Sequence, residues 1–216
     1  MATTTVMIGC RDPARAAALT RAVAARNVVV AIDAWPLEQA VAAGSDEDTA
    51  VVVLDGYPTG AALRAMADLT TARPELAVLV LGPLEPNLEV LIALASGAFG
   101  YLPTMSTPGA VADAVDALLA GDAVLPRAVS LPLVQHLRWG GRGMVVTGLD
   151  GGTAELTNRE WEVLVLLRQG RSTAEIAGRL VVSNGTIRTH VAALVHKLDA
   201  GDRSGLTVST HHCGRA

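Results

Sequence analysis

The sequence predicts an α/β domain with a parallel sheet, followed by a small all-α domain. Five short apolar runs alternate with helical stretches in the first half of the chain, which is typical of a parallel sheet covered by helices on both faces. The 216 residues are enough for two such domains. Charge is also divided unevenly: residues 1–153 hold 9 basic and 15 acidic side chains, a balance of −6, whereas residues 154–216 hold 8 and 6, a balance of +2. Any polyanionic partner is therefore expected at the second domain.

The runs expected to form strands are nearly unbroken in hydrophobicity, which favours strands buried on both faces. They are Val6–Gly9, Val28–Asp33, Ala50–Asp55, Ala77–Leu81 and Phe99–Leu102. The stretches expected to form helices are rich in Ala and Leu, and they are Pro13–Ala25, Pro36–Ala43, Ala61–Thr71, Leu88–Ser96 and Pro108–Ala120. Sites in such sheets form at the carboxyl ends of the strands. The segments that follow the strands are Gly9–Asp12, Asp55–Pro58, Gly82–Leu84 and Pro103–Met105.

Several classes of protein are disfavoured by the sequence. The uncharged segment Val90–Ala112 is broken by Gly and Pro, and its apolar part is too short to cross a bilayer. Cys10 and Cys213 are the two cysteines and give no disulfide framework, which fits a reducing cytosol. We expect a cytoplasmic protein with no membrane partner. Patterns for catalysis or a nucleotide cofactor are absent from the sequence. His211–Cys213 resembles a metal cluster but has no further ligands nearby in sequence, and a disordered tail is expected there. We therefore expect no catalytic residue, no metal and no cofactor.

A glycine-rich segment separates the two predicted domains. Trp139–Glu155 contains six glycines and is predicted to be a flexible linker. The predicted organisation is a first domain over residues 1–125, a linker over residues 126–154 and a second domain over residues 155–216.

Two capping boxes mark helix starts in the second domain, at Thr157–Glu160 and Ser172–Glu175. Gly170 is predicted to end the first of these helices. After the short link Val181–Val182, Ser183 can cap a third helix. A helix, a three-residue turn and a second helix form the geometry of a DNA-binding helix-turn-helix motif.

The third helix has one apolar stripe and an opposite face of small neutral residues. At about 100° per residue the stripe consists of Ile187, Val191, Leu194 and Leu198. A small face with Arg188 at its edge can enter the major groove, where Arg188 donates to a guanine and the Thr189 methyl meets a thymine methyl. The residues expected to touch phosphates are Ser183, Thr186, His190 and Lys197. A solvated helix of a small bundle is the alternative that periodicity leaves open.

Residues Leu156–Asp202 resemble the output domain of LuxR-type response regulators, also called the NarL/FixJ family. An ordered match carries the resemblance: Leu156–Glu160, Glu162–Leu164, Ala174–Ala177, Ser183–Val191 and Lys197–Leu198. It implies a four-helix domain that binds double-stranded DNA as a homodimer, with base-reading positions at Arg188, Thr189 and Ala192. Relatives often carry a basic residue where Ala192 stands. The fourth helix should start near Asp202, where Gly205 and the β-branched residues after it disfavour a helix.

The first half, over about Thr4–Ala120, resembles the flavodoxin-like (βα)5 receiver domain of the same family, and Asp55 occupies the position of its phospho-acceptor. The resemblance implies an acidic pair that holds Mg²⁺, a hydroxyl and a lysine around that aspartate. This chain departs from the pattern at each of these positions: they hold Cys10 and Arg11 with Asp12 adjacent, then Gly82 and Thr104. Tyr101 matches the aromatic residue that relatives use as a conformational reporter.

These departures predict a transcriptional regulator, not an enzyme, that is controlled without ordinary Mg²⁺-dependent phosphorylation or a cognate histidine kinase. One hypothesis is a permanent ion pair between Arg11 and Asp55 that imitates a bound cation. The alternative is a ligand-sensing pseudo-receiver, because Gly82 and Thr104 leave room for a small molecule. Cys10 beside Arg11 is a candidate redox sensor, although a buried structural thiol is the commoner case. Because the fourth helix is weak, the first domain is expected to supply most of the dimer interface.

Overall fold

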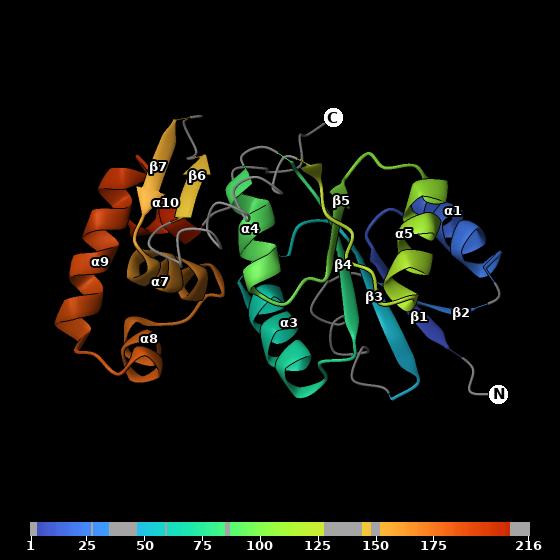
Figure 1. Ribbon diagram of the computed structural model, residues 1–216, viewed down its shortest axis with the longest axis horizontal. Helices are drawn as coiled ribbons and strands as arrows, with labels where there is room; N and C mark the ends of the chain where they lie inside the picture. Colours follow the sequence, from blue (N-terminus) through green and yellow to red (C-terminus); the bar gives the residue numbers. More distant parts are fainter. Residues whose placement is uncertain are drawn as a thin grey trace. The chain divides into compact units, whose positions relative to one another are not determined.

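The computed structural model describes residues 4–26, 28–34, 47–58, 60–84, 87–127, 144–147 and 152–207. Contacts divide the chain into two units, and Figure 1 shows the elements of both. The first unit holds Met1–Pro83 and Ala93–Pro126, and the second holds Leu84–Ile92 and Arg127–Ala216. None of the helices in these described stretches is long and apolar enough to cross a membrane.

The first unit is built on a five-stranded parallel sheet with the strand order β2-β1-β3-β4-β5. The strands are β1 (Thr5–Cys10), β2 (Val29–Ala34), β3 (Thr49–Asp55), β4 (Ala77–Gly82) and β5 (Gly100–Pro103). Each predicted strand is confirmed to within a residue or two at its ends. The middle strands are buried on both faces, as their unbroken apolar sequences predict: Val51, Val52, Val53 and Leu54 are all fully buried.

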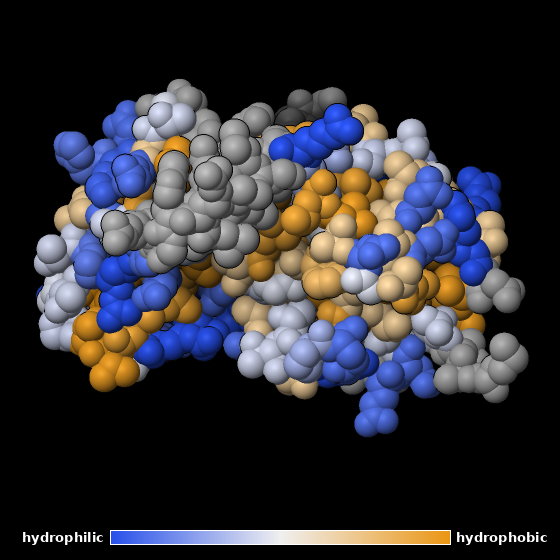
Figure 2. Space-filling model, viewed as in Figure 1, coloured by the Kyte–Doolittle hydropathy of each residue, from blue (hydrophilic) through white to orange (hydrophobic). Residues whose placement is uncertain are grey.

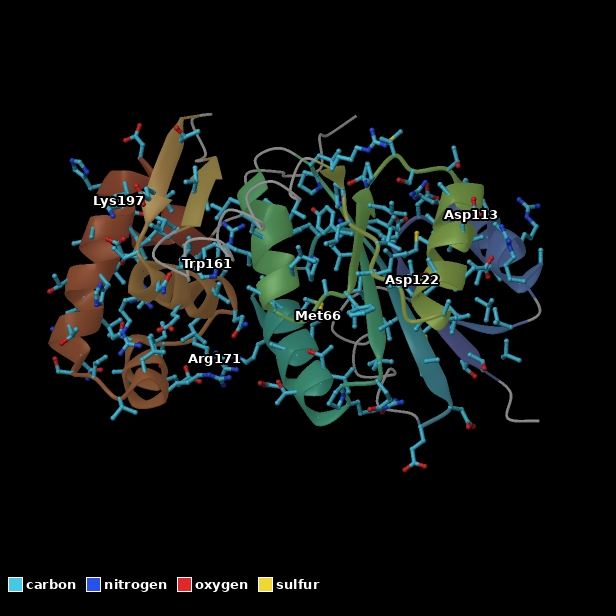
Figure 3. All side chains as sticks on the ribbon, in the orientation of Figure 1. Met66, Asp113, Asp122, Trp161, Arg171 and Lys197 are labelled. Atoms are coloured by element: carbon cyan, nitrogen blue, oxygen red, sulfur yellow. The ribbon has the colours of Figure 1, made fainter. Side chains whose placement is uncertain are left out.

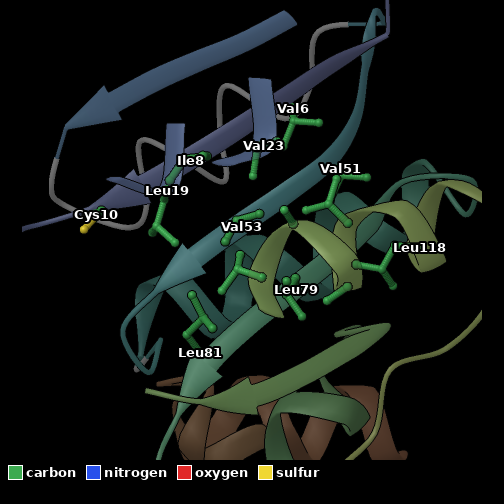
Figure 4. Packing of buried hydrophobic residues seen from close by; sticks show 14 of the residues in the cluster. Val6, Ile8, Cys10, Leu19, Val23, Val51, Val53, Leu79, Leu81 and Leu118 are labelled. Carbon is green, nitrogen blue, oxygen red and sulfur yellow. The ribbon is translucent and has the colours of Figure 1, made fainter. Parts of the chain in front are cut away.

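Helices cover both faces of this sheet (Figure 1). On one face, α1 (Pro13–Ala24) and α5 (Pro108–Leu119) pack on the strands and on each other. The core between these helices and the sheet consists of aliphatic side chains and Cys10 (Figure 4). On the other face lies α3 (Ala61–Ala72). The helix predicted over Pro36–Ala43 falls outside the described residues. This architecture places the carboxyl ends of β1, β3, β4 and β5 along one edge of the sheet.

The second unit contains a hairpin that was not predicted from the sequence. Strands β6 (Met144–Thr147) and β7 (Thr153–Leu156) pair antiparallel, with Val146 and Leu156 buried. The prediction of a flexible linker is therefore wrong for these residues. The glycines between the strands are typical of a hairpin connection, and the β-branched run Val145–Thr147 supplies one strand.

Four helices follow the hairpin: α7 (Asn158–Arg168), α8 (Thr173–Leu180), α9 (Asn184–Lys197) and α10 (Arg203–Thr207). Both predicted capping boxes are present, because Thr157 and Ser172 each exchange hydrogen bonds with the glutamate three residues on. Gly170 follows the end of α7 with φ at +72°, as expected for a residue that terminates a helix. The elements α8 and α9, joined by residues 181–183, confirm the predicted helix-turn-helix.

The last described helix, α10, is held in place by contacts that the sequence analysis did not foresee. A Cβ at Gly205 would lie 1.9 Å from the Ala200 carbonyl oxygen, so glycine is required there by close packing. The Asp202 carboxylate accepts a bond from the Gly205 amide, and Leu206 is buried. From the sequence, Gly205 was expected only to destabilise the helix. The structure shows that it also allows α10 to pack against residue 200.

Candidate DNA-binding surface and carboxylate pocket

Asp55 lies at the carboxyl end of β3, directly beside Cys10 in the register of β1 and β3. Its side chain is almost fully buried, with 5% of its surface exposed. One oxygen, Oδ2, accepts a bond from the Cys10 thiol at 2.9 Å and a bond from the Arg15 guanidinium at 2.7 Å. The other oxygen, Oδ1, is buried and has no hydrogen-bond partner among the described residues.

The cation that reaches Asp55 is Arg15, in the first turn of α1, and not Arg11. The Arg15 Nε donates to Asp55, while its Nη2 donates to the carbonyl oxygens of Thr104 at 2.7 Å and Ser106 at 3.3 Å. Arg11 is exposed ahead of the helix. The hypothesis of a pair between Arg11 and Asp55 is therefore wrong in its residue, although an arginine does pair with the aspartate. This one side chain joins α1, the end of β3 and the loop after β5.

Cys10 is a protonated donor in this cluster. Burial, then the hydrogen bond to the Asp55 carboxylate and its negative charge, raise the pKa of the Cys10 thiol to about 12. The sequence suggested that a neighbouring arginine gives Cys10 thiolate character. In the structure, the Asp55 carboxylate raises the pKa of the thiol more than the arginine lowers it. A thiol that stays protonated at neutral pH is a poor nucleophile, so the redox-sensor interpretation is not supported.

Asp12 is used as a helix cap. Its carboxylate accepts bonds from the amides of Ala14 at 2.9 Å and Arg15 at 3.4 Å, and Pro13 takes the first helical position. The cap offsets the unfavourable position of a cation in the first turn of a helix. The sequence left open that Asp12 replaces part of the missing acidic pair. In this structure, its carboxylate caps α1 instead.

The space beside Gly82 is filled. A Cβ there would lie 2.2 Å from the Tyr101 hydroxyl oxygen and 3.3 Å from a ring carbon of Tyr57. Tyr101 is fully buried and donates its hydroxyl hydrogen to the Pro83 carbonyl oxygen at 2.7 Å. Gly82 is therefore what permits the buried position of Tyr101. Of the room on which the ligand-sensing alternative rested, the part beside Gly82 is occupied by these aromatic side chains.

On the second unit, helix α9 presents the faces that the sequence predicts. Ile187, Val191, Leu194 and Leu198 are buried, which confirms the apolar stripe. The opposite side is exposed, and it carries Arg188, Thr189 and Ala192. Within the described residues, no hydrogen bond or ion pair engages the Arg188 guanidinium.

Hydroxyl groups near the start of α9 are bonded locally. Ser183 caps the helix by accepting from the Thr186 amide at 3.0 Å, and the two hydroxyl oxygens lie 2.9 Å apart. Thr189 donates to the Gly185 carbonyl oxygen, while His190 is half-buried. The turn before the helix contains Val181, whose φ is +54° and whose surface is 88% exposed. Figure 2 shows an apolar protrusion at this turn between α8 and α9.

Lys197 joins three elements of the second unit. Its ammonium donates to the Glu160 carboxylate at 2.8 Å and to the Glu155 carbonyl oxygen at 3.0 Å, so the end of α9 is tied to α7 and β7 (Figure 3). Burial raises the pKa of the Glu160 carboxyl, but bonds from Lys197 and Thr157 outweigh it and lower the pKa below its usual value. The sequence analysis expected Lys197 to touch phosphate and did not anticipate this role.

Comparisons with known proteins match both halves of the chain. Residues 154–210 match the family described as bacterial regulatory proteins, luxR family. The transcription regulator BvgA of Bordetella pertussis is 34% identical over 151 residues, which cover 69% of each chain. The transcriptional activator ExaE of Pseudomonas putida is 30% identical over 172 residues, which cover 78% of this chain and 77% of ExaE. The structure of RcsB from Salmonella enterica serovar Typhimurium, bound to a promoter, aligns with a TM-score of 0.54 at 20% identity over 95% of this chain and 96% of RcsB.

Proposed function

We propose, from the premise that the chain belongs to the LuxR (NarL/FixJ-type) family of response regulators, that this DNA-binding transcriptional regulator acts without Mg²⁺-dependent phosphorylation of its receiver domain. The observation that carries the proposal is the ion pair between Arg15 and Asp55, whose atoms lie 2.7 Å apart. In a working receiver, the aspartate at this position contacts a metal ion and accepts a phosphoryl group. In this protein, the Arg15 guanidinium binds the Asp55 carboxylate instead.

The residues around Asp55 do not fit Mg²⁺. That ion takes hard oxygen ligands, whereas the positions beside Asp55 carry a protonated thiol at Cys10 and the guanidinium of Arg15. Asp12, the carboxylate nearest to Cys10 in sequence, is engaged in capping α1. No step through a metal is therefore assigned to this site.

Phosphorylation of Asp55 would also lack its usual charge compensation. A phosphoryl group brings about −1.5 to −2 charges. Where relatives have a lysine, this chain has Thr104, and the single lysine of the whole chain is Lys197 in the second unit. The Asp55 Oδ2 already accepts two hydrogen bonds from the protein, which supports a structural role for this carboxylate rather than a role as phospho-acceptor.

A phosphodonor assay tests this proposal. Incubation with a small-molecule phosphodonor and Mg²⁺ should leave the intact mass of the purified protein unchanged, and it should leave the affinity for DNA unchanged. Asp55→Ala serves as the matched control. A stoichiometric phosphate adduct on the parent that is lost in Asp55→Ala would contradict the proposal.

For the DNA contact, we propose that α9 enters the major groove with Arg188 at a guanine edge and Thr189 and Ala192 against neighbouring bases. Ser183, Thr186 and His190 then lie toward the phosphates. The support is the exposed face of α9 together with an Arg188 side chain that has no partner in the described residues. Arg188→Ala should cost about 1–3 kcal/mol of binding free energy and relax sequence preference. A variant that binds with unchanged sequence preference in a DNA titration would contradict this assignment.

We further propose that the regulator binds DNA as a homodimer with most of the interface on the receiver domain, because a single half-site offers few specific contacts. Gly205 and the β-branched residues after it disfavour a long helix, which supports a small contribution from α10. Sedimentation of the full chain should be compared with a fragment that begins at Met144 and so retains the β6–β7 hairpin. The fragment is expected to be monomeric, and a fragment that dimerises as tightly as the full chain would refute the assignment.

A further inference from the structure

The seven basic side chains between Gly152 and Thr207 differ in whether the protein itself already binds them. Five of them are engaged: Arg159 with Glu162 and the Leu180 carbonyl, Arg168 with Glu89, Arg171 with Gln169, Lys197 with Glu160, and Arg203 with Thr173. The two that remain, Arg179 and Arg188, are exposed. Neither has a hydrogen bond or an ion pair within the described part of the chain.

These two arginines lie on either side of one exposed segment. Arg179 is in the last turn of α8, and Arg188 is in the second turn of α9. No residue from Gly178 to Thr186 is buried, and an added Cβ at Gly178 would touch nothing within 4 Å. The segment that joins the two helices is thus open to a partner along its whole length.

We propose that Arg179 contacts a backbone phosphate of the DNA, at the edge of the groove that α9 enters. In a helix-turn-helix, the second helix enters the major groove while the first crosses the backbone. Arg179 is on that first helix, close to the turn, and its guanidinium has no competing partner in the described structure. Lys197, the residue for which the sequence analysis predicted a phosphate contact, has its ammonium already bound to Glu160 and the Glu155 carbonyl.

This inference rests on the proposed entry of α9 into the major groove, and it does not depend on how the receiver domain is controlled. It predicts a weak dependence of DNA affinity on salt. Each phosphate contact contributes a slope of about −0.9 to the logarithm of affinity against the logarithm of salt concentration. Of the seven basic side chains in the described part of the domain, Arg179 and Arg188 are available, and Arg188 is assigned to a base. The slope should therefore be far shallower than the number of basic residues implies.

The experiment compares single substitutions in the full-length protein. Arg179→Ala, Arg179→Lys and Arg171→Ala are titrated with a duplex that the parent selects from a random pool, and with an unselected duplex. Arg171→Ala is the matched control because it removes the same charge from the same domain at a side chain bonded to Gln169. Between 50 and 200 mM salt, Arg179→Ala should reduce the loss of affinity by about 3.5-fold for each protomer bound, equally on both duplexes. Arg179→Lys should retain most of the salt dependence.

Three results would overturn the proposal. An equal change in slope for Arg171→Ala would mean that net charge alone is responsible. Relaxed sequence preference in Arg179→Ala would mean that the side chain reads a base, and an unchanged slope would mean that it makes no phosphate contact. Thermal unfolding of each variant, followed by circular dichroism, checks that the fold is retained. If Arg179→Ala is unstable, Arg179→Gln gives the same comparison with a longer side chain.

Discussion

The carboxylate pocket of the receiver domain and the recognition surface of the second unit each contain an arginine, but the two arginines are used in opposite ways. In the pocket, the Arg15 guanidinium donates to Asp55, Thr104 and Ser106, so its bonding capacity is used inside the protein. On the recognition surface, Arg188 is exposed and has no bond within the described residues. The presence of a basic residue therefore says little about binding a polyanion. Its availability in the folded protein is what matters.

Two glycines, Gly82 in the pocket and Gly185 on the recognition surface, show the same contrast in their surroundings. Gly82 adjoins the Tyr101 hydroxyl so closely that a Cβ would meet it at 2.2 Å. At Gly185, near the start of α9, an added Cβ would meet only the Ser183 hydroxyl, at an ordinary distance of 3.5 Å. One glycine is required by the protein's own packing, and the other leaves space on the outer face of the recognition helix. Four substitutions test how far this contrast holds.

The largest effect is expected from Arg15→Ala, which leaves the buried Asp55 carboxylate without its cation. Removing one partner from such a pair costs several kcal/mol when both groups are buried. Because Arg15 is 24% exposed, we expect the free energy of unfolding to fall by about 3 kcal/mol, as measured by urea denaturation. DNA affinity of the folded variant should be unchanged.

Two variants control this result. Arg21→Ala removes an exposed arginine from the same helix, and it should cost less than about 0.5 kcal/mol. Adding Asp55→Ala to Arg15→Ala should recover most of the stability, because the unpaired carboxylate is then gone. If Arg15→Ala is no worse than Arg21→Ala, the ion pair is not what stabilises the pocket.

Gly82→Ala is expected to have the next largest effect. The added methyl group overlaps the Tyr101 hydroxyl, and overpacking of this kind costs about 1–3 kcal/mol. The free energy of unfolding should fall by that amount, and the near-ultraviolet circular dichroism of the tyrosine should change as Tyr101 is displaced. Gly109→Ala, where an added Cβ meets nothing within 4 Å, is the matched control. Equal stability of the two variants would show that the pocket has room after all.

Gly185→Ala should have the opposite sign. Alanine is favoured over glycine within a helix by about 1 kcal/mol, and nothing in the described structure resists the extra methyl group. The thermal unfolding temperature of the free protein should therefore rise. If close approach of DNA is the reason for glycine at this position, affinity should fall in the same variant. A variant that is both more stable and equally able to bind would show that Gly185 has no role in recognition.

The smallest effect concerns the pH dependence of the pair between Lys197 and Glu160. Because the pKa of Glu160 is lowered in the folded protein, its ionised form stabilises the fold above about pH 4.5, and this contribution is lost as the pH falls through the folded-state pKa. Lys197→Met should cost less than about 1 kcal/mol at pH 7, since the lysine is 35% exposed. The difference between parent and variant should disappear once the pH is well below the folded-state pKa of Glu160. A difference that persists there would mean that packing of the lysine stem, rather than charge, is responsible.

Much of the fold follows from local signals in the sequence. The unbroken apolar runs set the strands of the receiver domain, and the capping boxes at Thr157 and Ser172 set the starts of α7 and α8. These signals are short in range, because a capping box involves residues three apart and a buried strand needs only its own composition. The β6–β7 hairpin was missed because its glycine content is equally typical of a linker.

The site was less predictable, because its contacts join residues far apart in the chain. The resemblance to a receiver domain suggested a pair between Arg11 and Asp55, but in the structure Arg15 makes it, and the place of Arg15 in the first turn of α1 is set by the cap at Asp12. Similarly, Lys197 is engaged by Glu160 and Glu155, which no pattern in the sequence connects to α9. Sequence indicates which charges exist, and only the folded structure shows which of them are already used.

The bonds from the Lys197 ammonium to Glu160 and to the Glu155 carbonyl oxygen, which we call the Lys197 clamp, also have a chemical consequence. Because Lys197 is the single lysine among 216 residues, it is the only side-chain amine that an acylating reagent can modify. Acylation removes the positive charge and two of the three amine hydrogens, so it should release Glu160 and separate β7 from the end of α9. The rate of labelling at this residue, followed by mass spectrometry, therefore reports how often the clamp opens in the intact regulator, with no need for an engineered probe.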